Sequence, residues 1–579
     1  MNGKHGMNGV NGILASRWLL IALVALLLYW PMLMLVGGIF RSGAPGQAGE
    51  WTLAAVRRVI DSPATWKALG HSTVFALSTT FIGTLIGAFF AFISARTTAP
   101  LRGWLSPIML LLFAVPPLLY AVSWSLLADP GAGLLNQATR AAFDAAPFNA
   151  FSWGGMVAVH SLKLSGFAYL MLLPPFRNMN RSYEEASMIA GAGRLATLLR
   201  IDLPLLLPAI SGVVILGVIF GLGAFDVPAL LGALAGASML STRIFSTLSI
   251  SIPPDYAGAS ALGAVMMLML SLLLALQWRL VRGERFVTVT GKSASQEPWD
   301  LGRWGYAAGA LIVLFSTLCL LLPGVQLLLT SLQPAIGVNR YSLANYQSLL
   351  ADRQVLGALR LTVGHALLCG AIVMGLALVM GQTGRRAPLW LRRYLEIGSL
   401  APIMMPGVVL SIGLLWAFIS LPGLRLLYGS GWLVMIGLVI LTMPIASRIV
   451  SGALAQISRE LEEAAQIAGA GPPRVLTDVT LQLVRRSFLA GWLVCGVVAA
   501  GTLDIPLMLL GPGTPNVSVL VYSDMTLGGA PTRASALLLV LVAVVVGLTA
   551  LAVLTGAMWP ALRRLAGQVL HGRTAVAAA

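Results

Sequence analysis

EEASMIAGAG, at residues 184–193, returns almost unchanged as EEAAQIAGAG at residues 462–471, with eight of the ten positions identical. The repeat continues downstream, because Asp226-Val227-Pro228 recurs as Asp504-Ile505-Pro506 at the same separation of 278 residues. Both copies are polar islands in a mostly apolar chain. A charged segment that is kept twice indicates that the chain consists of two equivalent halves.

The composition places most of this chain in a lipid bilayer. Of its 579 residues, 58% are hydrophobic and 10% are charged, and the mean hydropathy is +0.87. Apolar runs of about 20 residues recur, which is the length that a helix needs to cross the hydrocarbon core. Strand-like alternation is absent, which argues against an outer-membrane barrel. The sequence therefore predicts an all-α polytopic membrane protein.

About twelve transmembrane helices are expected, in two sets of six. The first set is predicted at 18–36, 68–94, 104–127, 153–175, 206–225 and 257–278. The second set is predicted at 304–330, 357–381, 395–420, 431–450, 487–510 and 534–558. An even number per set makes the repeats parallel, related by a pseudo-two-fold axis along the membrane normal. The halves are then 1–278 and 304–579, joined by a cytoplasmic linker at 279–303.

The net charge of +17 is interpreted as membrane topology rather than as a nucleic-acid surface. Most Lys and Arg residues fall in alternate loops, which is typical of cytoplasmic segments. This pattern predicts that both termini lie in the cytoplasm. Arg17 precedes the first apolar run, and no small-residue cleavage site follows that run, so it is interpreted as a membrane helix rather than a signal peptide.

The repeated segment lies between the fourth and fifth spans of each half, in loops at about 177–205 and 451–486. Short helices are expected at 183–190 and 461–468, ended by turns at Gly191 and Gly469. The prolines Pro204 and Pro208 are expected to interrupt the helix where the fifth span begins. The adjacent glutamates are expected to be free to meet a basic partner. A plain solubilising loop is the alternative, which the duplication disfavours.

The loops resemble the signature of the permease subunits of bacterial ABC importers, which is Glu-Ala-Ala, three residues, Gly, nine residues, Ile, one residue and Leu-Pro. The first copy matches as Glu185-Ala186-Ser187, Gly191, Ile201 and Leu203-Pro204; the second as Glu463-Ala464-Ala465, Gly469, Val479 and Leu481-Gln482. In the second copy Gln482 replaces the final proline, which puts the mechanical equivalence of the two loops in question.

The resemblance implies that both loops dock on a separate ATP-binding subunit, expected as a homodimer, which hydrolyses ATP with Mg²⁺. The residues that it assigns to this coupling are Glu184, Glu185, Ala186, Gly191, Glu462, Glu463, Ala464 and Gly469. The chain has no Gly-x-x-x-x-Gly-Lys-Ser/Thr loop, so it is expected to be no enzyme and to bind no cofactor. A periplasmic or lipid-anchored solute-binding protein and membrane lipid are the other expected partners, with no nucleic acid. The resemblance also implies that the chain lies in the bacterial inner membrane.

The fused halves resemble the ferric-iron and thiamine branch of these importers. The segments 226–232, 241–245 and 505–514 resemble loops of ferric-iron permeases, so ferric iron is the leading substrate. Importers of thiamine, polyamine or phosphonate are the alternatives within this class. An ion-coupled secondary transporter, which also uses internal repeats, and a structural membrane scaffold are alternatives outside it.

Four polar residues are candidates for the translocation pathway. Asp226 and Asp504 occupy equivalent positions near the outer ends of the fifth and eleventh spans, where they either face each other to assist a cation or cap the helices that follow. His160 and Lys163 fall inside the fourth span, where an ionisable group is costly and either lines a water path or pairs with a carbonyl.

No metal site is predicted. His71 and His365 are isolated from carboxylates and thiols, which makes them weak metal ligands. The three cysteines, Cys319, Cys369 and Cys495, sit inside apolar runs and are interpreted as inert buried thiols.

Overall fold

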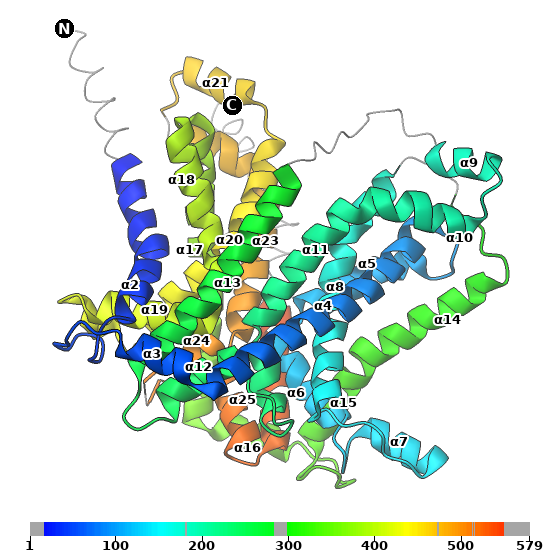
Figure 1. Ribbon diagram of the computed structural model, residues 1–579, viewed down its shortest axis with the longest axis horizontal. Coiled ribbons are helices and arrows are strands. Elements are labelled where there is room, and N and C mark those ends of the chain that lie inside the picture. Colours follow the sequence, from blue (N-terminus) through cyan, green and yellow to red (C-terminus); the bar gives the residue numbers. More distant parts are fainter. Residues whose placement is uncertain are drawn as a thin grey trace, which may run out of the picture.

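The structure, a computed structural model of the chain, describes residues 17–179, 182–282, 298–471, 474–511, 513–514 and 516–548. Within these residues all regular structure is helical, and β-pairing is limited to isolated bridges. The helices form one elongated bundle, with α9 (Ser182–Ile189) and α21 (Arg459–Ile467) at one end and α7 (Leu134–Phe143) and α16 (Ala344–Ala351) at the other (Figure 1). The predicted all-α membrane architecture is confirmed.

The long apolar helices follow the predicted order. In the first half they are Arg17–Gly38, which includes η1 (Ala25–Tyr29) and α2 (Trp30–Gly38), α4 (Pro63–Arg96), α5 (Arg102–Ala114) with α6 (Pro117–Leu127), α8 (Trp153–Asn178), η2 (Leu198–Asp202) with α11 (Leu203–Gly223), and α13 (Tyr256–Arg282). In the second half they are α14 (Trp304–Ser316), η4 (Thr317–Leu321) and α15 (Leu322–Leu332), α17 (Arg353–Arg386), α18 (Leu389–Leu400), η5 (Ala401–Met404) and α19 (Gly407–Ile419), α20 (Gly431–Ala455), η7 (Val475–Thr480) with α23 (Leu481–Gly501), and Pro531–Leu548.

Short helices connect the long ones at both ends of the bundle. Besides α7, α9, α16 and α21 they are α3 (Ala54–Asp61), α10 (Arg194–Thr197), η3 (Pro228–Gly232), α12 (Leu240–Ser249), η6 (Leu424–Leu427), α24 (Asp504–Leu509) and α25 (Val517–Thr526). Three predicted parts of the chain lie outside the described residues: both termini, the linker residues 283–297, and the end of the last span at 549–558.

The third span of each half is bent, which the sequence interpretation missed. The α5–α6 pair bends by 100° and the α18–α19 pair by 114°. Pro116 and Pro406 explain the bends, because proline forces the residue before it out of helical geometry. Val115 has ψ 127° and Met405 has ψ 85°, so each helix stops there and a second one begins in a new direction.

Each bent pair still runs from one end of the bundle to the other. α5 begins shortly after Arg96, which contacts α9, and α6 ends at Leu127, where the N–H of Ala150 bonds the carbonyl of Ala128 just ahead of α8. Since the unbroken α8 packs along α4 and returns to the α9 end, the α5–α6 pair must cross between the two ends. Within the described residues ten helices are long and apolar enough to cross a membrane, and the number reaches the predicted twelve when each bent pair is one span, with the third and ninth then bent rather than straight.

Prolines widen several helices rather than ending them. In η1, η2 and η4, the N–H that follows each π turn bonds the carbonyl five residues earlier, and a proline comes next: Pro31, Pro204 and Pro323. A wider turn moves the carbonyl that a proline ring would otherwise strike. The predicted interruption at Pro204 and Pro208 is therefore wrong, because Leu198–Gly223 is one continuous helical span.

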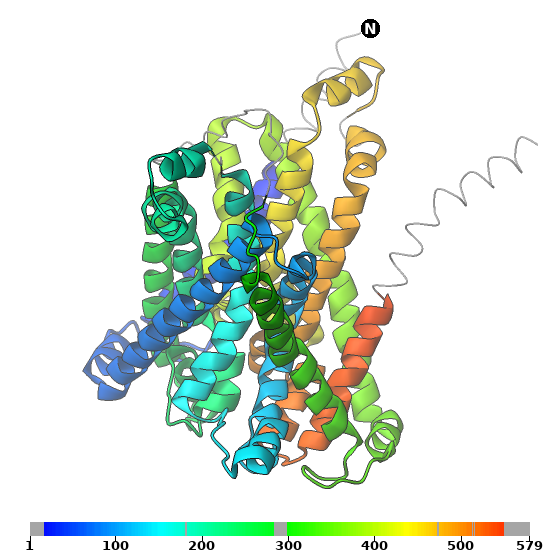
Figure 2. The same ribbon diagram turned by 90° about the vertical axis from the view of Figure 1, so that its right-hand side faces the viewer.

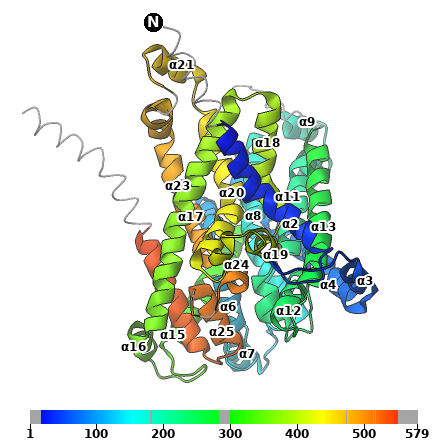
Figure 3. The same cartoon turned by 90° about the vertical axis from the view of Figure 1, so that its left-hand side faces the viewer.

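The two halves exchange their first spans. Arg17–Gly38 packs on α18 and α19 of the second half, where Tyr29 stacks on Tyr394 at 5.1 Å between ring centroids (Figure 3). Conversely, α14 and α15 pack on α5 and α6 of the first half, and Phe315 contacts Phe90 at 4.6 Å (Figure 2). The halves defined along the chain are thus interlocked in space.

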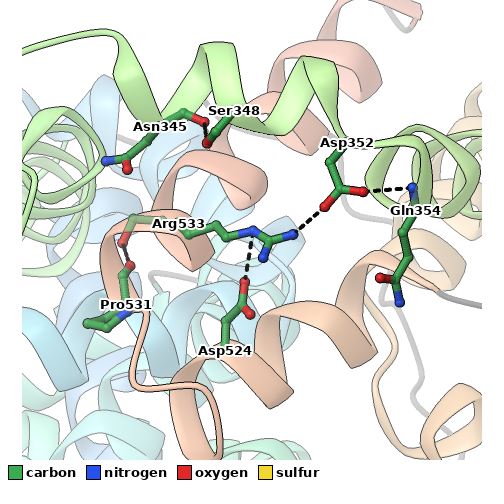
Figure 4. A network of polar contacts seen from close by, with 8 residues as sticks. Asn345, Ser348, Asp352, Gln354, Asp524, Pro531 and Arg533 are labelled. Atoms are coloured by element: carbon green, nitrogen blue, oxygen red, sulfur yellow. Dashed lines mark hydrogen bonds and ion pairs between the residues drawn. The ribbon is translucent and has the colours of Figure 1, made fainter.

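At the end of the bundle away from α9 and α21, each half has an ion pair between the start of its second span and the start of its last span. The arginine lies before the second span in the first half and at the start of the last span in the second half. In the first half Arg58 of α3 pairs with Asp255, next to the start of α13, at 3.2 Å. In the second half Arg533, at the start of the last described helix, pairs with Asp352 at 2.8 Å and with Asp524 at 3.7 Å (Figure 4). Burial raises the pKa of Asp524, and the Arg533 charge partly opposes this.

Glycines and prolines meet where the halves touch. A Cβ at Gly501, the last residue of α23, would lie 2.2 Å from Cβ of Pro116, and one at Gly223, the last of α11, would lie 3.0 Å from Cγ of Pro406. The two contacts are equivalent under the repeat. The approach at Gly501 therefore leaves no room for a Cβ, and the approach at Gly223 leaves very little.

The variant Gly501→Ala is expected to destabilise the protein by about 1–3 kcal/mol, since the new methyl group overlaps a rigid proline ring. Gly212→Ala in α11 is the matched control, because a Cβ there meets nothing within 4 Å. Thermal unfolding of the purified protein measures both. Equal melting temperatures for the two variants would show that the contact between halves is not tight.

Candidate functional site

The repeated segments fold alike. Each short helix ends at a glycine with positive φ, 86° at Gly191 and 89° at Gly469. The N–H of Ala192 bonds the carbonyl of Ser187, and the N–H of Ala470 bonds that of Ala465, each at 3.0 Å. This is the Schellman pattern, which terminates a helix through a left-handed residue. The predicted helices and their glycine turns are confirmed.

Glu184 is not free, which corrects the expectation that the glutamates of the loops await a basic partner. Its side chain is fully buried and forms an ion pair with Arg96, the last residue of α4, which is itself buried. The indole N–H of Trp299 donates to its other oxygen at 3.0 Å. Glu184 therefore ties α9 to the end of the second span.

Glu462 repeats this arrangement in the second half. It is buried and pairs with Arg385, near the end of α17, at 3.0 Å, and the same guanidinium donates to the carbonyl of Ile457 at 2.9 Å. Arg385 is 18% exposed, compared with 4% for Arg96. We call Arg96–Glu184 and Arg385–Glu462 the anchor pairs.

The exposed face of each short helix is largely apolar. Ile189 is 87% exposed and Ile467 is 88% exposed, at positions that are equivalent in the repeat. The neighbouring Ala186 and Ala464 are also exposed. An isoleucine that the fold leaves in water twice, at the same place, is typical of a surface that a partner covers. The sequence interpretation missed these isoleucines because it concentrated on the charges.

Exposed glutamates flank this apolar face. Glu185 and Glu463 each follow an anchor glutamate and lie on the outside of α9 and α21. The acidic pair in each copy therefore divides its roles, with the first residue holding the loop and the second facing outward.

The two loops differ in how they join the fifth or eleventh span. In the first, Ser187 and Thr197 share a hydroxyl hydrogen bond of 2.9 Å between α9 and α10. In the second, Ala465 and Val475 occupy the corresponding positions and have no hydroxyls. Both loops nevertheless enter the membrane helix through a π turn, η2 or η7, so Gln482 in place of proline does not change the backbone path.

Part of the predicted linker belongs to the first anchor. The backbone of Trp299 bonds residues on both sides of Thr97: its N–H donates to the carbonyl of Arg96 at 2.7 Å, and its carbonyl accepts from Thr98 at 3.0 Å. Its ring packs edge-on against Phe92. Residues 298–303 are therefore packed structure rather than a free connection.

A second polar group lies where the halves meet. Asp226 and Asp504 directly follow the ends of α11 and α23, and both are half-buried. Asp226 is close enough to interact electrostatically with both Asp504 and Lys163, and Lys163 with His160. The structure thus brings all four predicted pathway residues into one region.

Two of these residues, Lys163 and Asp504, contact the helix ends at the bends of the third and ninth spans. The ammonium of Lys163 contacts the carbonyls of Leu112, Phe113 and Val115, which end α5, and so compensates the exposed carbonyls at the break. The carboxylate of Asp504 lies against the N–H groups of Gly407 and Val408, which begin α19. Asp504 also accepts from the N–H of Ile505 at 2.9 Å, at the start of α24, so it caps the helix that follows it, as predicted, as well as one helix of the bent pair.

Asp226 has no such helix end to cap. At the position of Gly407 the first half has Pro117, which lacks an N–H, and Oδ1 of Asp226 has no hydrogen-bond partner within the described residues. Nε2 of His160 is likewise unpartnered there, although its ring packs against Phe75. The repeat is therefore asymmetric at this point: Asp226 has Lys163 as a nearby counter-charge, but its Oδ1 lacks a hydrogen bond within the described residues.

The weaker histidines and the thiols are structural. His71 packs against Trp153, His365 is buried, and the three cysteines are buried and free of disulfides. Within the described residues no group of three or more His, Cys, Asp or Glu side chains is placed to hold a metal ion.

Comparison with known proteins agrees with this arrangement. The family model described as "Binding-protein-dependent transport system inner membrane component" matches twice, at residues 83–285 and 373–564. The "Probable ABC transporter permease protein y4fN" of Sinorhizobium fredii is 28% identical over 495 residues, covering 82% of this chain and 83% of its own length. The "Ferric transport system permease protein FbpB" of Actinobacillus pleuropneumoniae is 23% identical, covering 68% and 58%.

A shorter match involves a different substrate. The "Putrescine transport system permease protein PotI" of Escherichia coli is 30% identical over 138 residues, covering 23% of this chain and 47% of that protein. Because the family model covers well over half of the chain, in two copies that each contain one anchored helix, this protein belongs to the family of inner-membrane permease components of binding-protein-dependent ABC transport systems, with two permease halves fused in one chain.

Proposed function

We propose that this chain alone forms the membrane channel of an ATP-driven importer, in which α9 and α21 each dock on one subunit of an ATPase homodimer. The observation that carries this proposal is the pair of equivalent short helices at one end of the bundle, each with an exposed isoleucine above a buried anchor pair. The end that carries them is then cytoplasmic. A periplasmic or lipid-anchored solute-binding protein delivers substrate to the opposite end.

The anchor pairs give the route by which the ATPase moves the membrane helices. A push on α9 passes through Glu184 to Arg96, hence to α4, which packs along α8 and α11. A push on α21 passes through Glu462 to Arg385 and α17, which packs along α20 and α23. Since α11 and α23 end at the tight contacts between the halves, their movement opens or closes the region around Asp226.

Reconstitution tests the proposal. The chain is incorporated into vesicles with its ATPase, and the binding protein and substrate are added on the side away from α9 and α21. We expect uptake that requires ATP and all three components. Uptake driven by a sodium or proton gradient without ATP would instead establish an ion-coupled secondary transporter.

For the substrate we propose a cation, with ferric iron as the leading candidate. Asp226 lies between the halves with one carboxylate oxygen that has no hydrogen-bond partner within the described residues, and a passing cation would supply that partner. A ferric permease and a putrescine permease are both among the relatives, and both substrates are cationic. Thiamine and phosphonate remain the alternatives, distinguished by which binding protein supports uptake.

The variant Asp226→Asn is expected to reduce cation uptake by about tenfold or more, because a carboxylate–cation contact contributes more than 1.4 kcal/mol. Asp504→Asn is the matched control: an asparagine still accepts from the N–H groups that begin α19, so a smaller loss is expected. Uptake and substrate-stimulated ATP hydrolysis are measured together. Equal uptake by wild type and Asp226→Asn would remove Asp226 from the pathway.

A further inference from the structure

A polar cavity of about 330 Å³ lies beside the first anchor pair and has no part in the function proposed above. Ser94 lies on its wall near the end of α4, Arg102 and Ser106 at the start of α5, and Arg177 at the end of α8. Pro298, which directly precedes Trp299, completes the lining. Three membrane helices and the end of the linker therefore converge on it.

The cavity is positively charged. Arg102 and Arg177 both line it, and none of the described lining residues is acidic. Neither arginine has a carboxylate partner within the described residues; Arg102 donates to the carbonyl of Thr97, and Arg177 is exposed. The first turn of the 13-residue helix α5 also faces the cavity, which adds the positive end of its dipole.

The wall of the cavity is held in place by a chain of hydroxyl groups. The buried Tyr169 bonds Ser106 at 2.8 Å and Ser94 at 2.9 Å, so it joins α5 to α4 across α8. Fixed hydroxyls beside two guanidinium groups suit the oxygens of a phosphate group. The site is thus built by the fold rather than formed by chance at mobile surface side chains.

We propose that this cavity binds the phosphate of an anionic phospholipid headgroup. Free phosphate has the same chemistry, but the surroundings favour lipid. Trp104, at the start of α5, is 65% exposed, and Trp304, at the start of α14, is 79% exposed. Gly309 of α14 packs on Pro100, which brings the two helix starts together. Exposed tryptophans mark the headgroup level of a membrane, and basic pockets at that level bind anionic headgroups.

Binding at this cavity acts on the first coupling loop. Pro298 lines the cavity, and the next residue donates its indole N–H to Glu184. A headgroup that holds Pro298 and Arg102 in place therefore also stabilises the anchor pair of α9.

Native mass spectrometry of the full chain in nanodiscs tests the proposal. The discs contain phosphatidylcholine with or without phosphatidylglycerol, and retained lipid is counted. Wild type is expected to retain phosphatidylglycerol preferentially, and the double variant R102Q/R177Q to lose that preference by on the order of tenfold. R393Q is the control, because Arg393 is an exposed residue of α18, the counterpart of α5.

Three outcomes are distinguishable. Loss of the preference in R102Q/R177Q but not in R393Q, with no effect of inorganic phosphate, supports the lipid site. If inorganic phosphate displaces the lipid, or raises the melting temperature in phosphatidylcholine discs only when both arginines are present, the site serves a soluble anion and the lipid assignment is overturned. Equal retention by all variants overturns the site itself. Normal thermal unfolding of R102Q/R177Q in phosphatidylcholine discs confirms that the variant folds.

Discussion

Replacing both exposed isoleucines, Ile189→Asp with Ile467→Asp, is expected to abolish ATP-driven uptake while leaving the membrane helices folded. Each side chain projects into water, so the fold loses nothing. In the docked complex each must enter a desolvated surface, where the loss of such a contact costs on the order of 2 kcal/mol. Over two sites this corresponds to about a thousandfold weaker assembly with the ATPase.

Co-purification of the ATPase and uptake in vesicles measure the effect, and thermal unfolding checks the fold. The control is Ile189→Leu with Ile467→Leu, which keeps an apolar surface of similar size and is expected to retain most uptake. Each single aspartate variant should show an intermediate loss of uptake if both loops bind the ATPase. ATPase retention by the double aspartate variant would show that the docking surface lies elsewhere on the chain.

Of the two anchor glutamates, Glu184 is expected to contribute more to the stability of the protein than Glu462. Glu184→Ala leaves the buried guanidinium of Arg96 without its carboxylate, and breaking such a pair costs about 3–5 kcal/mol. Glu462→Ala leaves Arg385, which is partly exposed and recovers hydration, so we expect a smaller loss of about 1–3 kcal/mol. Thermal unfolding of the two variants should therefore rank them in that order.

Neutralising both charges together separates the effect of the ion pair from that of simple packing. Glu184→Gln with Arg96→Gln removes both charges together and should be milder than Glu184→Ala, since no unpaired charge stays buried. Glu463→Ala, one residue beyond the second anchor and exposed, serves as the surface control and should be near neutral. If Glu184→Ala and Glu463→Ala had the same melting temperature, Glu184 would not be an anchor.

The class of this fold could be predicted from the sequence, because apolar runs and a repeated polar segment are local signals. The glycine turns at Gly191 and Gly469 were also predictable, since a helix followed by glycine has few ways to end. The bends were not predicted, although Pro116 and Pro406 carry their signal. Their neighbours are as apolar as the rest of each span, and hydropathy alone does not register direction.

The anchor pairs could not be predicted from the loops. Whether a glutamate points outward or inward depends on what lies beneath it, and the partners Arg96 and Arg385 are many residues away in sequence. The arginines sit at the ends of the second spans, where a basic residue is ordinarily explained by membrane topology. Likewise, Asp226 and Asp504 are identical residues at equivalent positions. Asp504 lies against the N–H of Gly407, and the first half has Pro117 where the second has that glycine.

The exchanged first spans have a consequence for biogenesis. When Arg17–Gly38 leaves the ribosome, the helices on which it finally rests, α18 and α19, have not yet been synthesised. Until more than half of the polypeptide has been inserted, α13 of its own half is the final neighbour on which it can pack, and the face that meets α18 and α19 stays in lipid. A fragment that stops at the linker would therefore keep a leading helix that is only partly packed, and neither half should mature alone into a native unit.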